Sequence, residues 1–307
     1  MQPELSGVLV IDKPANITSA KVTAFLKKAL KARKTGHAGT LDPFATGVLV
    51  CCINSATRLA RFFLHDNKKY EAVLHLGVAT DTQDPTGTIT STCDNVNFSE
   101  KTIRSAFKQF EGAVDQLPPI YSALKHKKVP LYKLARSGKP VQKPARPIYI
   151  SYIKILDINL PFIRFEVSCS AGTYIRTLCA DIGKSLGCGG HLKELKRIES
   201  SGFTIRDAIN FSELKELALS ENLPDNLSGR IISMADALPN MPAHIADNAL
   251  KEKIKHGKTI TKTDFMSKPL PVPEGFIKVV EPTNDLIAVL NLQKESDRFK
   301  YCCVFNN

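Results

Sequence analysis

The sequence predicts an α+β protein with a largely antiparallel sheet and a small, mostly β unit at its C-terminal end. Strand-like and helix-like segments follow one another without the regular βαβ alternation of a doubly wound sheet. Two strand-like runs, Ile148–Ile158 and Phe162–Ser168, come one directly after the other. Three further β-like runs fall within the last 32 residues, as expected for a β-rich appendage.

The elements before the middle of the chain follow from local patterns of apolar and polar residues. We expect, in chain order, a strand at Gly7–Ile11, a helix over Ala20–Lys31 capped by Thr18 or Ser19, a buried strand at Gly47–Ile53, a helix over Ser55–Leu64, a strand at Tyr70–Val78, a turn at Thr80–Gly87 and a helix over Phe98–Phe110.

Residues Leu117–Arg146 hold five of the eighteen prolines and have no clear period, so they predict a long loop or arm. After the two strands we expect helices over Tyr174–Ser185 and near Arg206–Ala218. A short helix at Asp247–His256 then precedes the β-like runs Phe276–Val280, Leu286–Leu292 and Tyr301–Phe305. We therefore predict two domains, residues 1–240 and residues 241–307.

The charge of the chain indicates an anionic partner. Lys and Arg exceed Asp and Glu by 42 to 30, a net charge of +12 with a pI near 9.3. Two long stretches, Lys13–Leu41 and Gln116–Leu156, hold seven and nine basic residues and no acid. A single basic stretch is an ordinary solvated surface about as often as it is a binding surface. Two of them, one interleaved with Tyr121 and Tyr132, favour nucleic acid over an acidic lipid surface.

Several other classes of function are disfavoured. No apolar run is long enough for a membrane helix, and the first residues lack a signal-peptide core, so we expect a cytoplasmic protein. The eight cysteines form no C-x-x-C pair and predict buried, reduced thiols instead of a zinc or redox site. Gly183-Lys184-Ser185 ends like a phosphate-binding loop, but the required earlier glycine is Leu178.

The most informative stretch is Gly36-His37-Ala38-Gly39-Thr40-Leu41-Asp42-Pro43-Phe44-Ala45-Thr46-Gly47-Val48-Leu49. Three glycines and a proline predict a tight loop just before a strand, which projects Asp42 and His37 from the rim of a sheet. An isolated Asp-Pro is usually only a turn. The whole segment, beside a basic helix, indicates more than a turn.

This stretch resembles the catalytic loop of the TruB family of tRNA pseudouridine synthases. Four further segments resemble that family in the same order: Val10-Ile11-Asp12-Lys13-Pro14, Lys69-Tyr70-Glu71-Ala72 with Thr80-Asp81-Thr82-Gln83-Asp84, Pro118–Lys125, and Gly172-Thr173-Tyr174-Ile175-Arg176-Thr177-Leu178 followed by His191-Leu192-x-x-Leu195-x-Arg197. The resemblance covers residues 7–205 closely and the remainder more loosely. The chain departs from it at Ala38, where threonine is common, and at residues 126–130, where a glycine is usual.

The resemblance implies a pseudouridine synthase fold with a PUA-like C-terminal domain, and it implies roles for three residues. Asp42 is expected to be the essential carboxylate, acting as nucleophile or base while the glycosidic bond is exchanged. Arg176 is expected to pair with Asp42 and keep it charged. Tyr70 is expected to stack on the extruded uracil. Without the resemblance, the sequence alone predicts that Arg176 is a surface arginine of a helix and that Tyr70 is a core aromatic residue of a strand.

Further residues are expected to bind the substrate. His37 would support base extrusion, Asp84 would join a polar network with Arg176, and Lys13 would support Tyr70 or the catalytic loop. Leu195 is expected to be an apolar wall of the pocket, and core packing explains it equally well. The arm at about 117–147 is expected to contact RNA through five basic residues: Lys125, Lys127, Lys128, Lys133 and Arg136.

Together these expectations describe an RNA isomerase that needs no metal or organic cofactor, acts as a monomer and binds the T-arm stem-loop of tRNA. A binding protein that helps tRNA to fold, with secondary or lost catalysis, is the alternative. Retention of both Asp42 and Arg176 argues against a protein that only binds. Binding to a membrane surface through the arm is disfavoured because the chain has no amphipathic helix with a large apolar face.

Overall fold

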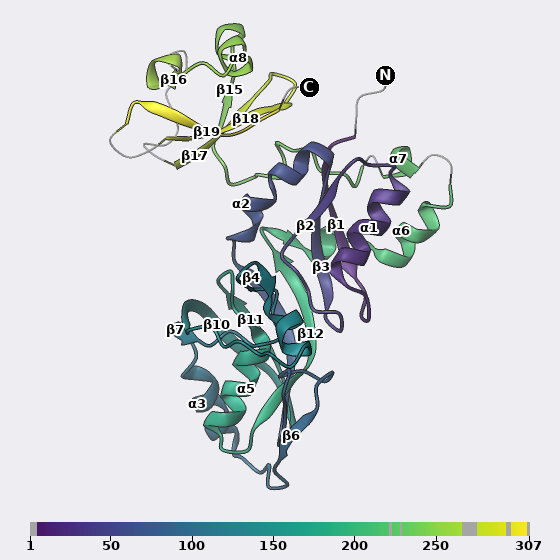
Figure 1. Ribbon diagram of the computed structural model, residues 1–307, viewed down its shortest axis with the longest axis vertical. Coiled ribbons are helices and arrows are strands. Elements are labelled where there is room, and N and C mark those ends of the chain that lie inside the picture. Colours follow the sequence, from purple (N-terminus) through teal and green to yellow (C-terminus); the bar gives the residue numbers. More distant parts are fainter. Residues whose placement is uncertain (1–4, 221–222, 228, 266–274, 293–295, 306–307) are drawn as a thin grey trace.

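The computed structural model describes residues 5–220, 223–227, 229–265, 275–292 and 296–305. Within these residues a ten-stranded mixed sheet extends through most of the chain, and the C-terminal part forms a separate five-stranded sheet. Figure 1 shows the C-terminal sheet at one end of an elongated molecule, with helix α2 (Ala60–Leu64) next to it. The α+β class predicted from the sequence is confirmed.

The large sheet is mostly antiparallel, as predicted. Its main path runs in the order β14 (Ile209–Asn210), β1 (Gly7–Lys13), β3 (Thr46–Ile53), β12 (Gly190–Ser200), β4 (Lys68–Leu76), β11 (Phe162–Cys169), β10 (Arg146–Asn159) and β7 (Gly112–Gln116). Strand β2 (Thr35–Ala38) pairs with β3, and β13 (Phe203–Thr204) pairs with β12. Among the described strands of this sheet, only β1–β14 and β3–β12 pair in parallel.

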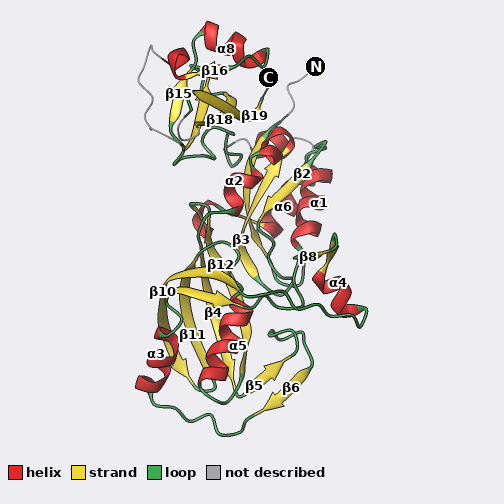
Figure 2. Ribbon diagram, turned by 60° about the vertical axis from the view of Figure 1, so that its left-hand side comes forward, coloured by secondary structure: helices red, strands yellow, loops and turns green. Residues whose placement is uncertain are grey.

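Helices cover one face of each half of this sheet. Figure 2 shows α3 (Glu100–Lys108) and α5 (Ile175–Ser185) along the lower half, and α1 (Ser19–Ala29) and α6 (Phe211–Leu217) along the upper half. The predicted cap of the first helix is confirmed, because the Thr18 side chain accepts a hydrogen bond from the Lys21 amide. A short helix α7 (Leu223–Asn226) follows α6.

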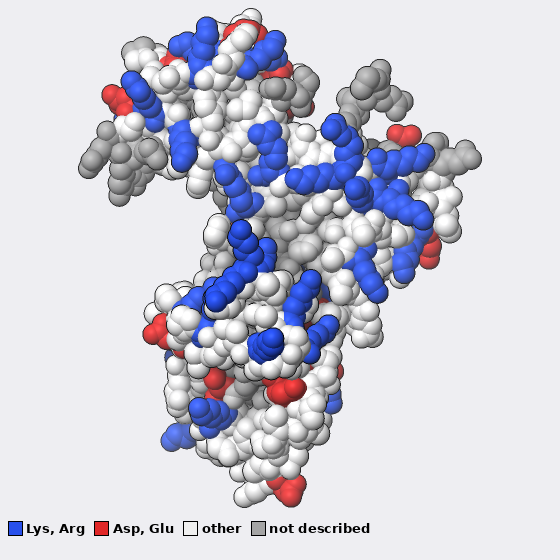
Figure 3. Space-filling model, in the orientation of Figure 1, with Lys and Arg blue, Asp and Glu red and all other residues white. Residues whose placement is uncertain are grey.

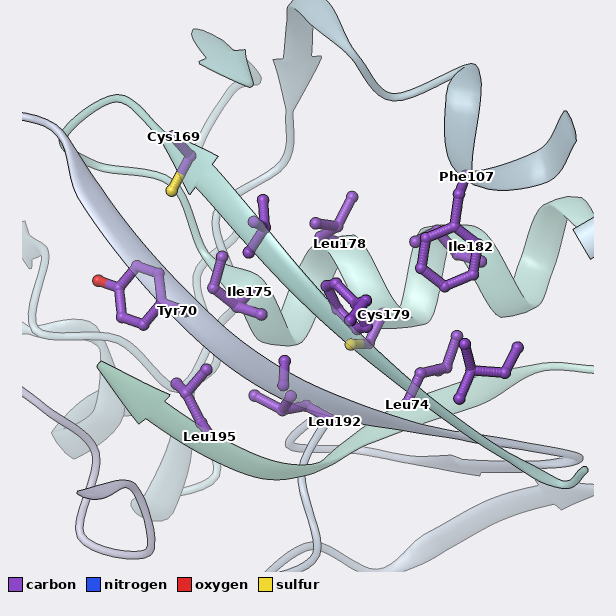
Figure 4. Packing of buried hydrophobic residues seen from close by; sticks show 14 of the residues in the cluster. Tyr70, Leu74, Phe107, Cys169, Ile175, Leu178, Cys179, Ile182, Leu192 and Leu195 are labelled. Carbon is purple, nitrogen blue, oxygen red and sulfur yellow. The ribbon is translucent and has the colours of Figure 1, made fainter. Parts of the chain in front are cut away.

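The buried core beside α5 explains the helix pattern of that segment. Ile175, Leu178, Cys179 and Ile182 recur at helical spacing, and all four are buried against the sheet. Figure 4 shows these side chains packed with residues of β4, β11 and β12. Gly183, part of the rejected phosphate-loop lookalike, lies in this helix where an added Cβ would be 2.4 Å from the Gly189 carbonyl carbon.

Two expected helices are corrected by the structure. The helix over Ser55–Leu64 is a 3-10 turn, η1 (Asn54–Arg58), followed by α2. The segment near Arg206–Ala218 holds a 3-10 turn η2 (Ile205–Asp207), strand β14 and only then helix α6. Polar side chains such as Thr204 and Asn210 cap successive short elements there, which divides an otherwise helical pattern.

The arm is more structured than the long loop predicted. It contains a two-stranded hairpin, β8 (Lys125–His126) and β9 (Val129–Pro130), and helix α4 (Leu131–Arg136). Another two-stranded sheet pairs β5 (Val78–Thr80) with β6 (Ile89–Thr92). Strands this short have no measurable periodicity, which is why the sequence predicted only a loop.

The C-terminal sheet has the order β15 (Ala243–Ile245), β17 (Gly275–Val280), β18 (Leu286–Leu292), β19 (Arg298–Val304) and β16 (Ile260–Thr261), with helix α8 (Asn248–Lys255) and a 3-10 turn η3 (Lys262–Phe265). Val289 and Cys303 of this sheet share a buried cluster with Val8 and Phe63. The two parts therefore pack on each other, and a domain boundary at residue 240 stays a prediction.

The structure also bears on the expectations about membranes and cysteines. Among the described residues, no helix is both long and apolar enough to cross a bilayer. The eight cysteines are free thiols and six are buried, as predicted.

Candidate active site

The loop between β2 and β3 carries Asp42 and is fixed by neighbouring side chains. The Leu41 amide donates a hydrogen bond to Ser19 Oγ at 2.9 Å, at the start of α1. Lys13, which is fully buried, donates from Nζ to the carbonyl oxygens of Pro14, Ile17 and Pro43. Burial lowers the pKa of Lys13 to about 8. The loop that presents Asp42 is thus anchored at two points.

Arg176 lies on the first turn of α5 and forms an ion pair with Asp42. Its Nε is 2.9 Å from Asp42 Oδ2, and the Arg176 side chain is 5% exposed whereas that of Asp42 is 35% exposed. The predicted pairing of these two residues is therefore present. Because the arginine is buried and the carboxylate is partly open, Asp42 is the member of the pair that a bound molecule can reach.

The remaining hydrogen bonds of Arg176 connect separate segments of the chain. Its guanidinium donates to the Thr82 carbonyl at 3.0 Å and to the Tyr121 carbonyl at 2.8 Å, and Nη1 lies 3.4 Å from Asp84 Oδ2. Asp84 is also held by Thr86, whose amide and hydroxyl both donate to its carboxylate. The polar network predicted for Asp84 and Arg176 is present, and it includes the base of the arm.

The surroundings of Asp42 act on its protonation in opposite directions. Burial raises the pKa of Asp42, while the charges of Arg176 and Lys13 lower it and that of Asp84 raises it. The net effect is a pKa of Asp42 above the ordinary value of an aspartate. Among the groups that favour the ionised form of Asp42, Arg176 has the largest effect.

Tyr70 and Leu195 lie together at the edge of the α5 core. Both are buried, 8% and 9% exposed, in one cluster with Leu41 and Ala45 of the catalytic loop. Figure 4 shows the Tyr70 hydroxyl pointing away from the labelled core residues, with Leu195 beside the ring. Burial raises the pKa of Tyr70, so its phenol is neutral. The pair provides an apolar wall with one polar end.

Arg197 also lies in this region, although no role was predicted for it. It is 1% exposed and donates from Nε to the Val48 carbonyl at 2.7 Å and from Nη2 to the Gly39 carbonyl at 3.0 Å. It lies opposite Tyr70 in the β4–β12 register, and its charge acts to lower the pKa of the Tyr70 hydroxyl against the larger effect of burial. The charged guanidinium therefore connects the start of the catalytic loop with strand β3, close to Tyr70.

The close approach of the Arg197 backbone requires a glycine at position 47, near the end of the catalytic loop. Gly47 has φ +100, and an added Cβ would lie 2.2 Å from the Arg197 carbonyl oxygen. Arg197 is part of the motif His191-Leu192-x-x-Leu195-x-Arg197, which could have suggested a role for it. No role was predicted because strand β12, which brings residues 190–200 beside the loop, was not predicted.

His37 lies on β2 and stays near the site without joining the ion-pair network. It pairs with Cys51 in the β2–β3 register, and its buried Nδ1 has no hydrogen-bond partner within the described part of the protein. Burial and the charge of Arg197 lower the pKa of His37. A neutral, half-buried imidazole beside the loop is suited to contact with a base.

The basic arm leaves the sheet next to Arg176. Its root is held to the start of α5 because the Gln116 amide group donates to the Tyr174 carbonyl at 3.0 Å and accepts from the Tyr174 amide at 2.8 Å. Further out, Lys127 and Lys128 occupy the two-residue hairpin turn with φ +47 and +68, a conformation that favours glycine. This is where the chain departs from the usual glycine.

The five basic residues predicted to contact RNA are exposed on this arm: Lys125, Lys127, Lys128, Lys133 and Arg136. None of them forms an ion pair within the described ranges. Figure 3 shows Lys and Arg side chains on both sides of the hollow at the middle of this face. The structure thus brings Asp42, Arg176 and Asp84 into one network, with Lys13 as an anchor, Tyr70 and Leu195 as a wall, and the arm alongside.

The described residues contain no group of three or more His, Cys, Asp or Glu side chains arranged to hold a metal ion.

Two family models match the chain. One, described as TruB family pseudouridylate synthase (N terminal domain), matches residues 27–175. The other, described as tRNA pseudouridylate synthase B C-terminal domain, matches residues 176–238. The first model ends at residue 175, so the two matches together include Asp42, Tyr70 and Arg176, whereas the anchor Lys13 lies before the matched residues.

Curated relatives match over most of their length. A tRNA pseudouridine synthase B from Geobacter sulfurreducens is 42% identical over 85% of this chain and 84% of its own. One from Syntrophotalea carbinolica is 44% identical over 88% of this chain and 87% of its own.

Solved structures of more distant proteins share the fold. A crystal structure of a Cbf5–Nop10–Gar1 complex is similar with a TM-score of 0.76 and 26% identity, covering 97% of this chain and 85% of that chain. A structure of an H/ACA ribonucleoprotein bound to a substrate RNA containing 2′-deoxyuridine is similar with a TM-score of 0.71 and 25% identity, covering 98% and 85%.

Proposed function

The chain belongs to the TruB family of pseudouridylate synthases and is an isomerase of the pseudouridine synthase fold. On this premise we propose that it acts on tRNA, converts the T-loop uridine U55 to pseudouridine, and uses Asp42 as the essential group. The observation that carries the proposal is the partly exposed Asp42 carboxylate held 2.9 Å from a buried Arg176.

The reaction exchanges one bond between ribose and base for another. The bond from C1′ to the ring nitrogen N1 breaks and a bond from C1′ to C5 forms. The hydrogen at C5 leaves as a proton and N1 takes up a proton, so the exchange is redox-neutral and the product is an isomer of uridine. An ionised carboxylate beside the sugar and the base edge can act as a nucleophile or a base in this sequence. Arg176 keeps Asp42 ionised and fixes its orientation through a planar, charge-assisted contact.

The other site residues support a substrate base that has left its stack. A uridine inside a folded loop cannot reach a carboxylate on the protein without being extruded. The Tyr70 and Leu195 wall offers the extruded uracil an apolar surface, and His37 lies on β2, directly before the loop that carries Asp42. These roles are part of the proposal, as is recognition of the T arm by a monomeric protein in the cytoplasm.

RNA as the substrate class is supported by the charge of the arm and by the relatives. The related H/ACA ribonucleoprotein is bound to a substrate RNA, and the curated relatives are named as tRNA pseudouridine synthases. The stretch Gln116–Leu156, which contains the arm, carries nine basic residues and no acid. A cationic surface beside a catalytic site provides affinity through phosphates and leaves the choice of base to the site.

The proposed function is tested by mapping the product. Unmodified tRNA and an isolated T-arm stem-loop are incubated with the protein. Because pseudouridine has the same mass as uridine, it is first labelled with a carbodiimide and then located by nuclease digestion and mass spectrometry. We expect one modified position, the T-loop uridine, in both RNAs. A product at another uridine, or modification of the tRNA without the stem-loop, would contradict the proposed specificity.

Replacing Lys127, Lys128 and Lys133 together by Ala is expected to weaken RNA binding about 10- to 100-fold at low salt. Each lysine is exposed, so the change leaves the core intact. Loss of three phosphate contacts would also reduce the slope of log affinity against log salt by about 3. Fluorescence anisotropy across a salt series measures both quantities. Replacing Lys251, Lys255 and Lys258 of the C-terminal part is the matched control, and an unchanged slope in the arm variant would remove the arm from the interface.

A further inference from the structure

Arg197 is a buried cation without an acidic partner. It is 1% exposed and donates to two backbone carbonyls, those of Gly39 and Val48, which lie on either side of the loop that carries Asp42. Within the described ranges, no Asp or Glu forms an ion pair with it. A buried charge is normally paired with an opposite one, because its removal from water is costly. The protein thus leaves the positive charge of Arg197 uncompensated.

The titratable groups around Arg197 add no negative charge. Its charge acts on the pKa of groups from four strands: Lys13 of β1, His37 of β2, Cys51 of β3, and Lys68 and Tyr70 of β4. Burial keeps the thiol, the phenol and the imidazole neutral, because it raises the pKa of Cys51 and Tyr70 and lowers that of His37. Both lysines are buried and donate to carbonyl oxygens. Positive charge is therefore in excess behind the catalytic loop.

Arg197 lies beside the wall that the proposed function assigns to the extruded base. It pairs with Tyr70 in the β4–β12 register and follows Leu195 by two residues, so the three side chains lie on one face of the sheet. Figure 4 shows Tyr70 and Leu195 side by side on that face. A uracil ring stacked on Tyr70 is therefore close to a charge that it does not touch.

The exchange places a negative charge on the base. When the bond between C1′ and N1 breaks, its electron pair leaves with the uracil ring, and the charge spreads over N1, O2 and O4. The charge disappears when C5 bonds to C1′, C5 releases its proton and N1 takes one up. A fixed cation in a site of low dielectric constant stabilises such a transient charge without rearrangement. Arg176 is less suited to this task, because it already pairs with two carboxylates.

We propose that the buried charge of Arg197 stabilises the negative charge that the uracil ring takes when its bond to ribose breaks. Arg197 acts through space, beside Tyr70 and without contact with the base. The inference rests on the proposed function, because it assumes that the uracil stacks on Tyr70 next to Asp42. An RNA phosphate is not the anion concerned, since a side chain that is 1% exposed offers it no accessible donor.

The test compares the binding of a charged base with that of a neutral one. One T-arm stem-loop carries 6-azauridine at the target position, whose N3–H loses its proton near neutral pH, and a second carries uridine, which stays neutral there. Both are bound to protein with Asp42→Asn, so that no exchange takes place. Anisotropy gives the two affinities across the pH at which the analogue ionises, and their ratio removes the titration of protein groups that act on both RNAs.

Four further variants are made in the Asp42→Asn protein. Arg197→Gln and Arg197→Met both remove the charge, and the second also fills the space without a polar group. Arg197→Lys keeps the charge but loses the planar fork to the two carbonyls. Lys196→Gln is the matched control, because it removes an exposed charge from the neighbouring position of β12, on the opposite face. Circular dichroism and binding of the uridine stem-loop identify the folded variants.

We expect the affinity for the analogue, relative to uridine, to rise about tenfold as the analogue ionises. A unit charge several ångströms away has an effect of about this size at an effective dielectric constant of about 20. Lys196→Gln and Arg197→Lys should keep this rise. Arg197→Gln and Arg197→Met should reduce it to about threefold or less.

Three outcomes would overturn the proposal. The rise is absent from the Asp42→Asn protein itself, or it is unchanged in a folded variant that lacks the charge of Arg197, or Arg197→Lys loses it as fully as Arg197→Gln does. The last result would show that the geometry of the loop matters and the charge does not. Failure of the proposed function would show separately, as absence of turnover on the uridine stem-loop by the wild type.

Discussion

Replacing Arg176 by Met is expected to reduce turnover on the T-arm stem-loop about 10³-fold. In the wild type one guanidinium pairs with the carboxylates of both Asp42 and Asp84. The change removes this shared partner, and the two negative charges then repel each other more strongly. It also frees the Thr82 and Tyr121 carbonyls. Loss of one member of a buried ion pair has an effect of about 2–5 kcal/mol, and a factor of 10³ is about 4 kcal/mol.

The pH dependence separates this electrostatic role from a loss of folding. Asp42 must be ionised to react, so activity falls as the pH drops through its pKa. Arg176 lowers that pKa, and its removal should therefore shift the acid limb of the rate profile to higher pH. Arg176→Lys keeps the charge without the planar fork, and we expect smaller changes in both rate and pH limb. A fall in rate with an unmoved acid limb would contradict the role given to Arg176.

Much of the fold was predictable because its long elements have clear patterns. The strand Gly47–Ile53 and the helix Tyr174–Ser185 were each predicted within one or two residues of β3 and α5. Both have buried faces with an uninterrupted apolar pattern, so local sequence and tertiary packing agree. The antiparallel character of the sheet followed from consecutive strands such as β10 and β11.

Strand β12 was missed because its pattern is mixed. Charged Lys193, Glu194, Lys196 and Glu199 alternate irregularly with buried residues, and two bulges shift its register against β4. Its position between β3 and β4 depends on pairing with distant segments. Local sequence does not encode such pairing, and the role of Arg197 in connecting Gly39 with Val48, close to Tyr70, could not be derived without it.

The residues of the candidate site were predicted from sequence motifs, and the structure shows how these residues come close together. Asp42 and Arg176 are 134 positions apart and come within 2.9 Å because β3 and the start of α5 lie on the same side of the central strands. The sequence did not decide whether Lys13 supports Tyr70 or the loop. In the structure, Lys13 donates a hydrogen bond to the loop at the Pro43 carbonyl.

Asp42→Asn should reduce turnover at least about 10⁴-fold, the largest effect expected for any single change in this chain. The amide has nearly the same shape, so the loop and its anchors at Ser19 and Lys13 are preserved. It is neither a nucleophile nor a base at neutral pH, and removal of such a group has effects of this size. RNA affinity should stay within about threefold, because phosphate contacts on the arm are untouched. The exposed Asp115→Asn is the matched control.

The central claim is that the carboxylate of Asp42 performs the exchange. It is tested by release of tritium from uridine labelled at C5 of the T loop, measured under single-turnover conditions with RNA binding determined on the same preparations. The wild type and Asp115→Asn should release the label, and Asp42→Asn should release none while it still binds the RNA. Release by Asp42→Asn at the wild-type rate would contradict the account, and full binding without release by the wild type would favour a protein that binds and folds tRNA without modifying it.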